Sequence, residues 1–161
     1  MNFDQVDPLT WVTYQIAPHV PAFVFSDLAE YQDALYEYME TFYQSYDLLL
    51  TPATSAVAAK NEDLLYPDEL LEKIKRMGSC DYESMVDITH EAFDFTYLRT
   101  SYSQLMNITG QPAISLPIYE NGAGLPLGSQ FSSKRGNEYQ LLQLAKQLED
   151  LDYLKADIVR L

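Results

Sequence analysis

The stretch between Arg99 and Glu120 contains no charged side chain, and it constrains the fold more than any other part of this sequence. Such a composition fits burial on several sides, because an unpaired charge inside a protein is costly. Gly110 and Pro112 interrupt the stretch: glycine adopts backbone conformations that are closed to other residues, and proline fixes its own backbone. We therefore expect a turn before Ala113 and a buried element after it.

Two short strands are predicted after this turn. Residues 113–119 form an apolar run, residues 120–124 include two glycines, and residues 125–131 alternate apolar with small or polar side chains. This pattern is typical of two neighbouring strands joined by a loop. A third apolar run at 47–51, directly before Pro52, is too short for a helix and also predicts a strand.

Three ordered motifs connect this sequence to a known family. Residues 107–117 read Asn-Ile-Thr-Gly-Gln-Pro-Ala-Ile-Ser-Leu-Pro, residues 124–131 read Gly-Leu-Pro-Leu-Gly-Ser-Gln-Phe, and Glu138 opens a leucine-rich helical pattern. In this order they resemble the C-terminal part of the amidase signature family, which consists of serine-dependent amide hydrolases. Residues 46–52, Tyr-Asp-Leu-Leu-Leu-Thr-Pro, resemble a strand of the same family.

The resemblance implies an α/β fold, a mixed β-sheet with flanking helices, built as the C-terminal piece of the amidase signature fold. It also implies acyl transfer through a serine ester without metal or cofactor, on linear or cyclic carboxamides. Within the family, the chain is most similar to amidases of the 6-aminohexanoate cyclic dimer hydrolase type. The motif turn supplies the candidate substrate-pocket residues, which are Asn107, Thr109, Gly110, Gln111 and Pro112.

No catalytic residue is assigned to this chain. The family's nucleophile lies in a glycine- and serine-rich segment, and none of the six glycines here has a glycine neighbour. Ser132, Ser133 and Lys134 have the residue types of the family's triad, but adjacent strand residues point to opposite faces. We therefore interpret this Ser-Ser-Lys string as a coincidence and expect the isolated chain to be inactive.

Two alternatives remain open. One is a fragment of a glutamyl-tRNA amidotransferase A subunit. It is weakened by Arg99-Thr100-Ser101, because resemblance to that branch implies an acidic residue in this neighbourhood. The other is a stand-alone, non-catalytic interaction protein. It is favoured by the acidic residues 1–98, which hold 18 acids and 4 bases, and by 13 tyrosines.

The net charge of −14 disfavours direct binding to nucleic acids and to anionic membranes. Cys80 is the single cysteine, so an internal disulfide is excluded, and with two histidines a cysteine–histidine metal site is not expected. The first residues lack the basic start and apolar run of a signal peptide. These features predict a cytoplasmic protein that binds no metal.

The rest of the chain predicts helices. Residues 1–25 are expected to be an irregular lead-in because of Pro8, Pro18 and Pro21, and residues 26–161 to hold the helices and core strands of a single domain. Apolar residues recur at helical spacing from Leu28 to Tyr46, with Asp27 and Glu30 as a capping box. Further helices are expected at 67–77, 81–95, 96–106 and after Asn137.

Acidic residues on the 26–46 helix, Glu40 among them, are interpreted as its solvated face. A chain that corresponds only to the C-terminal piece of the amidase fold should leave part of its sheet uncovered. We therefore also predict a homodimer through the exposed sheet surface.

Overall fold

The computed structural model describes residues 2–64 and 66–155. The chain divides into two compact units. Unit 1 comprises Met1–Asp27 and Lys60–Leu98, and unit 2 comprises Leu28–Ala59 and Arg99–Leu161. Each unit is described by itself below, and the expectation of a single domain stays a prediction.

Unit 1 is helical. It contains η1 (Phe3–Gln5), α1 (Pro8–Ile16), η2 (Ala17–His19), η3 (Asn61–Leu64), α3 (Asp68–Arg76), η4 (Met77–Ser79) and the first part of α4 (Tyr82–Thr109). The expectation of an irregular segment at 1–25 is wrong. Pro8 occupies the first turn of α1, where its missing N–H costs nothing, and the Asp7 carboxylate caps the helix by accepting from Leu9 N at 2.8 Å.

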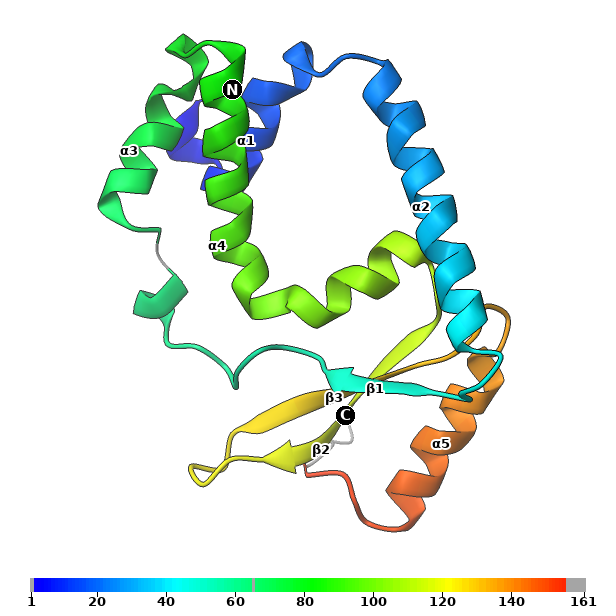
Figure 1. The fold of residues 1–161 in the computed structure, drawn as a ribbon. Helices are drawn as coiled ribbons and strands as arrows, with labels where there is room; N and C mark the ends of the chain where they lie inside the picture. Colours follow the sequence, from blue (N-terminus) through cyan, green and yellow to red (C-terminus); the bar gives the residue numbers. More distant parts are fainter. Residues whose placement is uncertain (1, 65, 156–161) are drawn as a thin grey trace. The chain divides into compact units, whose positions relative to one another are not determined.

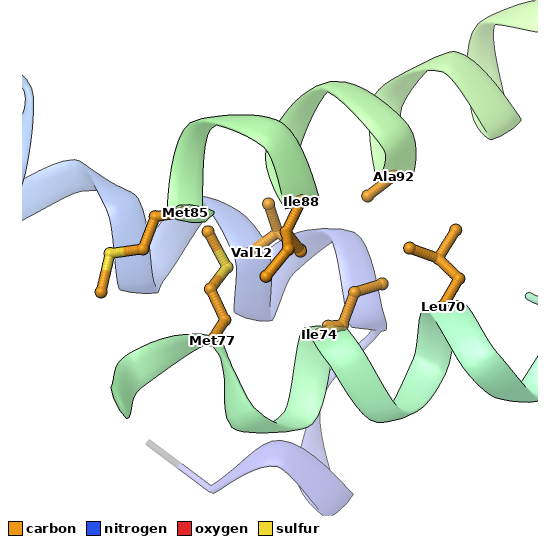
Figure 2. Close-up of a cluster of buried hydrophobic side chains, with 7 residues drawn as sticks. All are labelled: Val12, Leu70, Ile74, Met77, Met85, Ile88 and Ala92. Atoms are coloured by element: carbon orange, nitrogen blue, oxygen red, sulfur yellow. The ribbon is translucent and has the colours of Figure 1, made fainter. Parts of the chain in front are cut away.

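The core of unit 1 is formed by buried residues from α1, α3, η4 and α4. Figure 2 shows their side chains converging around Val12 of α1. The cluster consists of Val12, Leu70, Ile74, Met77, Met85, Ile88 and Ala92. Met85, Ile88 and Ala92 of α4 therefore face this core, and the helix expected at 67–77 is confirmed as α3 with η4.

Helix α2 (Phe23–Phe42) runs from unit 1 into unit 2. It begins three residues before the expected start, so Asp27 and Glu30 lie inside the helix and the capping-box prediction is wrong. It also ends earlier than expected, because residues 43–45 form a turn.

The buried face of α2 is rotated from the predicted apolar stripe. Met39 and Tyr43 are buried and pack with Met106, whereas Tyr31 and Tyr38 of the predicted stripe are exposed. Assigning Glu40 to the solvated face is also wrong. Its side chain is 20% exposed, and its Oε2 atom forms an ion pair with Lys134 Nζ at 3.4 Å.

Two further helices contribute to unit 2. Helix α4 continues through the predicted 96–106 segment to Thr109, and a non-helical backbone at Thr100 marks a kink. Helix α5 (Glu138–Asp150) follows Asn137 as predicted. The Asn137 side chain donates a hydrogen bond to the Gln140 side chain and makes none to the backbone of the first turn.

The sheet of unit 2 has three strands in the order β1-β3-β2, drawn side by side in Figure 1. Strands β1 (Leu49–Pro52) and β2 (Ala113–Glu120) both pair antiparallel with β3 (Pro126–Ser132). All three predicted strands are present, shifted by one or two residues. The parallel pairing that a mixed sheet implies does not occur between the strands described.

The two faces of the sheet differ in polarity, because side chains alternate along each strand. Leu116 and Phe131 pack with Leu141 of α5 on one face. The other face carries small and polar residues, among them Ser115, Gly128, Gln130 and Ser132.

Gly128 has no room for a side chain, because a Cβ there would lie 3.0 Å from Ala53 Cβ and would also collide with the Ser115 hydroxyl. The loop between β2 and β3 contains Gly124, whose φ of 78° favours glycine, and the Asn121 carboxamide accepts from Ala123 N and Leu125 N. The predicted hairpin is confirmed.

The α/β fold with a small sheet and flanking helices agrees with the expected fold class. Among the described residues, no helix is long and apolar enough to cross a membrane.

Candidate functional site

The turn at residues 109–112 lies between the end of α4 and the start of β2, within unit 2. Thr109 is fully buried, and its hydroxyl donates to Leu105 O at 2.7 Å. Gly110 ends the helix with a φ of 69°, and its N–H donates to Met106 O at 2.8 Å. A left-handed glycine after the last helical residue is a common helix stop, so this backbone is fixed by local chemistry.

Arg135 holds the turn from outside α4. Its Nη2 donates to Thr109 O at 2.7 Å, and its Nε donates to Gly110 O at 3.3 Å. The Cζ atom of the same guanidinium lies 4.0 Å from the centroid of the Tyr36 ring. Because two carbonyls of the helix end have no partner within the helix, Arg135 satisfies groups that would otherwise need water. The guanidinium therefore links the turn to α2.

Gln111 is the least satisfied residue of the turn. It is 5% exposed, and among the described residues neither its Oε1 nor its Nε2 has a hydrogen-bond partner. Its neighbour Pro112 accepts a hydrogen bond from Ser133 N at 3.2 Å, which ties the turn to the end of β3. Asn107 is exposed in the last turn of α4. A carboxamide offers one donor face and one acceptor face, so Gln111 is chemically complementary to another amide.

The Ser132-Ser133-Lys134 string supplies three separate contacts. The hydroxyls of Ser132 and Tyr43 are hydrogen-bonded at 2.8 Å, the Ser133 hydroxyl donates to Asn137 O at 3.3 Å, and Lys134 pairs with Glu40. Both serines are buried, with 1% and 0% exposure. The three side chains thus take different partners: Glu40 lies in α2, Tyr43 directly follows it, and Asn137 directly precedes α5.

The pKa of Tyr43, which belongs to this cluster, is raised from its ordinary value. Burial raises the pKa of the Tyr43 phenol, the hydrogen bond between Tyr43 and Ser132 acts in the lowering direction, and the Glu40 carboxylate raises the pKa further. The phenol therefore stays protonated at neutral pH, and it serves as a hydrogen-bonding group rather than a base.

The polar face of the sheet continues from this cluster. Gln130 is buried in the middle of β3, and its Nε2 donates to Thr51 Oγ1 at 3.4 Å. A surface hollow of about 410 Å³ lies at the same sheet, lined by Leu50, Thr51, Pro52, Tyr119, Leu127, Gly128 and Ser129. None of the five predicted turn residues lines this hollow. Their role in a substrate pocket stays a prediction.

Sequence reasoning placed the turn but missed the residues that hold it. Tyr36 and Glu40 belong to α2 and Tyr43 directly follows it, more than sixty positions before the turn in sequence. Arg135 follows β3, the second strand of the hairpin. No local spacing links these residues, because they meet only through packing.

Cys80 and His90 are not paired. The Cys80 thiol donates to Arg76 O at 3.8 Å, and His90 is exposed. Within the described part of the chain, no group of three or more His, Cys, Asp or Glu side chains is arranged to hold a metal ion.

Comparison with known proteins gives this arrangement a context. The profile of the amidase family matches residues 22–142, which include α2, the whole sheet and the 109–112 turn. The chain belongs to the amidase family. The resemblance inferred from the three motifs is therefore confirmed.

Individual amidase relatives extend this finding. A lipoamidase of Enterococcus faecalis is 31% identical over 154 residues, which is 91% of this chain and 20% of the relative. The glutamyl-tRNA(Gln) amidotransferase A subunit of Helicobacter pylori (strain G27) is 41% identical over 61 residues, or 38% of this chain and 14% of that protein. The chain thus spans a fifth or less of the length of these relatives.

The fold has a counterpart among solved structures. The structure of 6-aminohexanoate cyclic dimer hydrolase aligns with a TM-score of 0.64 and 25% identity, and it covers 94% of this chain and 29% of the hydrolase. The sequence-based expectation of similarity to this type of amidase is confirmed.

Proposed function

We propose that this chain is the C-terminal portion of a serine-dependent amidase that hydrolyses linear or cyclic carboxamides. In this proposal the chain supplies scaffold and part of the substrate pocket, and the catalytic triad comes from residues of the amidase fold that it does not hold. The observation that carries the proposal is the extent of the structural match: nearly all of this chain aligns with a cyclic amide hydrolase, yet it spans 29% of that enzyme.

The contacts of the Ser132-Ser133-Lys134 string support the view that it is not the nucleophilic centre. An activated serine needs an adjacent base and access to the substrate carbonyl. Ser132 and Ser133 are buried, and Lys134 is engaged by Glu40 at 3.4 Å. The 109–112 turn is the proposed pocket element, since it presents the Gln111 carboxamide on a backbone held by Arg135.

An amide hydrolysis assay tests the proposal. The purified chain is incubated with short aliphatic, cyclic and aryl amides, and ammonia or amine release is measured; no turnover above buffer is expected. Turnover that follows the protein through purification and is lost in Ser133→Ala, but not in the exposed-serine control Ser115→Ala, would contradict it.

An amidotransferase A subunit is a second candidate, favoured by the 41% identity over 61 residues. Its weakness is the sequence Arg99-Thr100-Ser101, because resemblance to that branch implies an acidic residue in this neighbourhood. Chemical-shift changes at residues 107–112 on titration with glutamine, and none with linear amides of 6-aminohexanoate, would favour this candidate over the first. A cytoplasmic location stays a prediction.

A further inference from the structure

One face of α2 carries apolar residues at helical spacing, and most of them are exposed. Leu28, Tyr31, Tyr38 and Phe42 recur at helical spacing, and Tyr46 continues the row beyond the helix end. We call this set the α2 tyrosine face. The spacing is the one that ordinarily predicts the buried side of a helix, because residues three, four and seven apart lie on one stripe.

The structure leaves four of these five residues exposed, whereas Phe42 is half-buried against the Met39, Tyr43 and Met106 cluster. Tyr38 is 74% exposed, Tyr46 59% and Tyr31 58%, whereas the neighbouring stripe with Met39 and Tyr43 is buried. Phe42 and Tyr46 stack on each other with ring centroids 4.7 Å apart. Their rings help to line a small hollow of about 170 Å³ beside Tyr38. The face is therefore an aromatic surface with one ring stack and one small hollow.

The acidic residues of α2 determine which kind of partner can bind this face. Helix α2 has five acidic residues and no lysine or arginine. Glu30, Asp33 and Glu37 are exposed, and the chain as a whole carries −14. A second copy of α2 would bring carboxylates against carboxylates, which disfavours self-pairing through this face. An amphipathic helix with lysine or arginine beside its apolar stripe would meet opposite charges instead.

We propose that the α2 tyrosine face binds a basic amphipathic helix of a protein partner. Tyrosines are suited to this role, because they bury a large ring at low entropic cost and keep the hydroxyl hydrated. The mode is the docking of one helix's apolar stripe along an apolar surface, with charged flanks setting orientation. The face shares no residue with the 109–112 turn, and the proposal does not rest on the amidase assignment.

A peptide-binding experiment tests the proposal. The probe is a fluorescent amphipathic helix made of leucine and lysine, titrated with the full chain and followed by anisotropy. Two further peptides serve as comparisons: one with glutamate in place of every lysine, and one of the same leucine and lysine content in scrambled order. We expect saturable binding of the first peptide, shifts in ¹H–¹⁵N spectra confined to residues 28–46, and no comparable affinity for the other two.

Variants locate the binding surface. The double variant Tyr31→Ser/Tyr38→Ser should weaken binding by at least about tenfold, as expected when aromatic anchors of an interface are removed. Tyr139→Ser is the matched control, since Tyr139 is 71% exposed on α5, and it should bind as the parent does. Circular dichroism should be unchanged in both variants, because the substituted side chains are exposed.

Three outcomes would overturn the proposal. Equal binding of the scrambled peptide would show attraction to net charge alone, and equal loss in Tyr139→Ser would place the binding elsewhere. The third is a dimer in sedimentation equilibrium that the Tyr31→Ser/Tyr38→Ser variant dissolves, which would assign the face to a second copy of this chain.

Discussion

The hydrogen bond between Tyr43 and Ser132 joins the residue after α2 to the last residue of β3, and its energy can be measured. The oxygens are 2.8 Å apart, and the two residues are 9% and 1% exposed. In Ser132→Ala, the Tyr43 hydroxyl stays buried without this partner, which should lower the free energy of unfolding by about 1–3 kcal/mol. Tyr43→Phe leaves the Ser132 hydroxyl unpaired and should cost a similar amount.

The double variant Tyr43→Phe/Ser132→Ala decides between a specific bond and two independent losses. Removing both partners leaves no unpaired hydroxyl, so the double variant should be little less stable than either single one. The coupling free energy should then be about 1 kcal/mol or more, well beyond the scatter of about 0.3–0.5 kcal/mol seen for independent sites.

Urea unfolding followed by far-UV circular dichroism supplies these values. The fluorescence of Trp11, the single tryptophan, is recorded in the same samples and reports on unit 1. Ser115→Ala is the control, because Ser115 is exposed on β2, and it should change stability by less than about 0.5 kcal/mol. If the stability losses of the two single variants simply add in the double variant, the hydrogen bond does not stabilise the contact between α2 and the sheet.

The remaining predictions use other parts of the molecule. Because the pKa of Tyr43 is raised in the folded state, stability should fall as pH rises above about 10, the ordinary tyrosine value, and an alkaline urea series should show a shallower fall in Tyr43→Phe. Gly110→Ala should lower the melting temperature, since φ is 69° there and the new Cβ would lie 2.7 Å from Arg135 Nη2. Gln111→Met should raise the free energy of unfolding by about 1–3 kcal/mol, because it removes a buried amide that has no hydrogen-bond partner among the described residues. Ile74→Ala should cost about 2–5 kcal/mol in urea unfolding, as Ile74 is fully buried in the core of unit 1.

Local patterns in the sequence were sufficient for the sheet and for most helices. Apolar runs bounded by proline and glycine predicted β1, β2 and β3 to within one or two residues. The α3 prediction held because Asp68 and Glu69 begin it and Lys73, Lys75 and Arg76 end it, as the helix dipole favours. The prediction at 1–25 was wrong because proline breaks a helix in its interior but is tolerated in its first turn. The presence of a proline does not show which of these positions it occupies.

The candidate site also has one part that local sequence determines and one part that depends on tertiary packing. The backbone of the 109–112 turn follows from Gly110 and Pro112, which act locally, so its place in the chain was predictable. The turn is also held by Arg135, which contacts Tyr36 of α2, a residue far away in sequence. A sequence shows which residues can make such contacts but not which of them meet.

Helix α2 shows why burial cannot be inferred from periodicity alone. Its sequence contains two adjacent stripes, one with Met39 and Tyr43 and one with Tyr31 and Tyr38, and both have helical spacing. Only the first is buried within unit 2, because Tyr43 reaches Ser132 and Met39 packs with Met106. A helix with one apolar stripe would need a single neighbour, whereas two stripes on one helix require a second surface to cover the other. The acidic residues beside the uncovered stripe then determine what that surface must carry, which is positive charge.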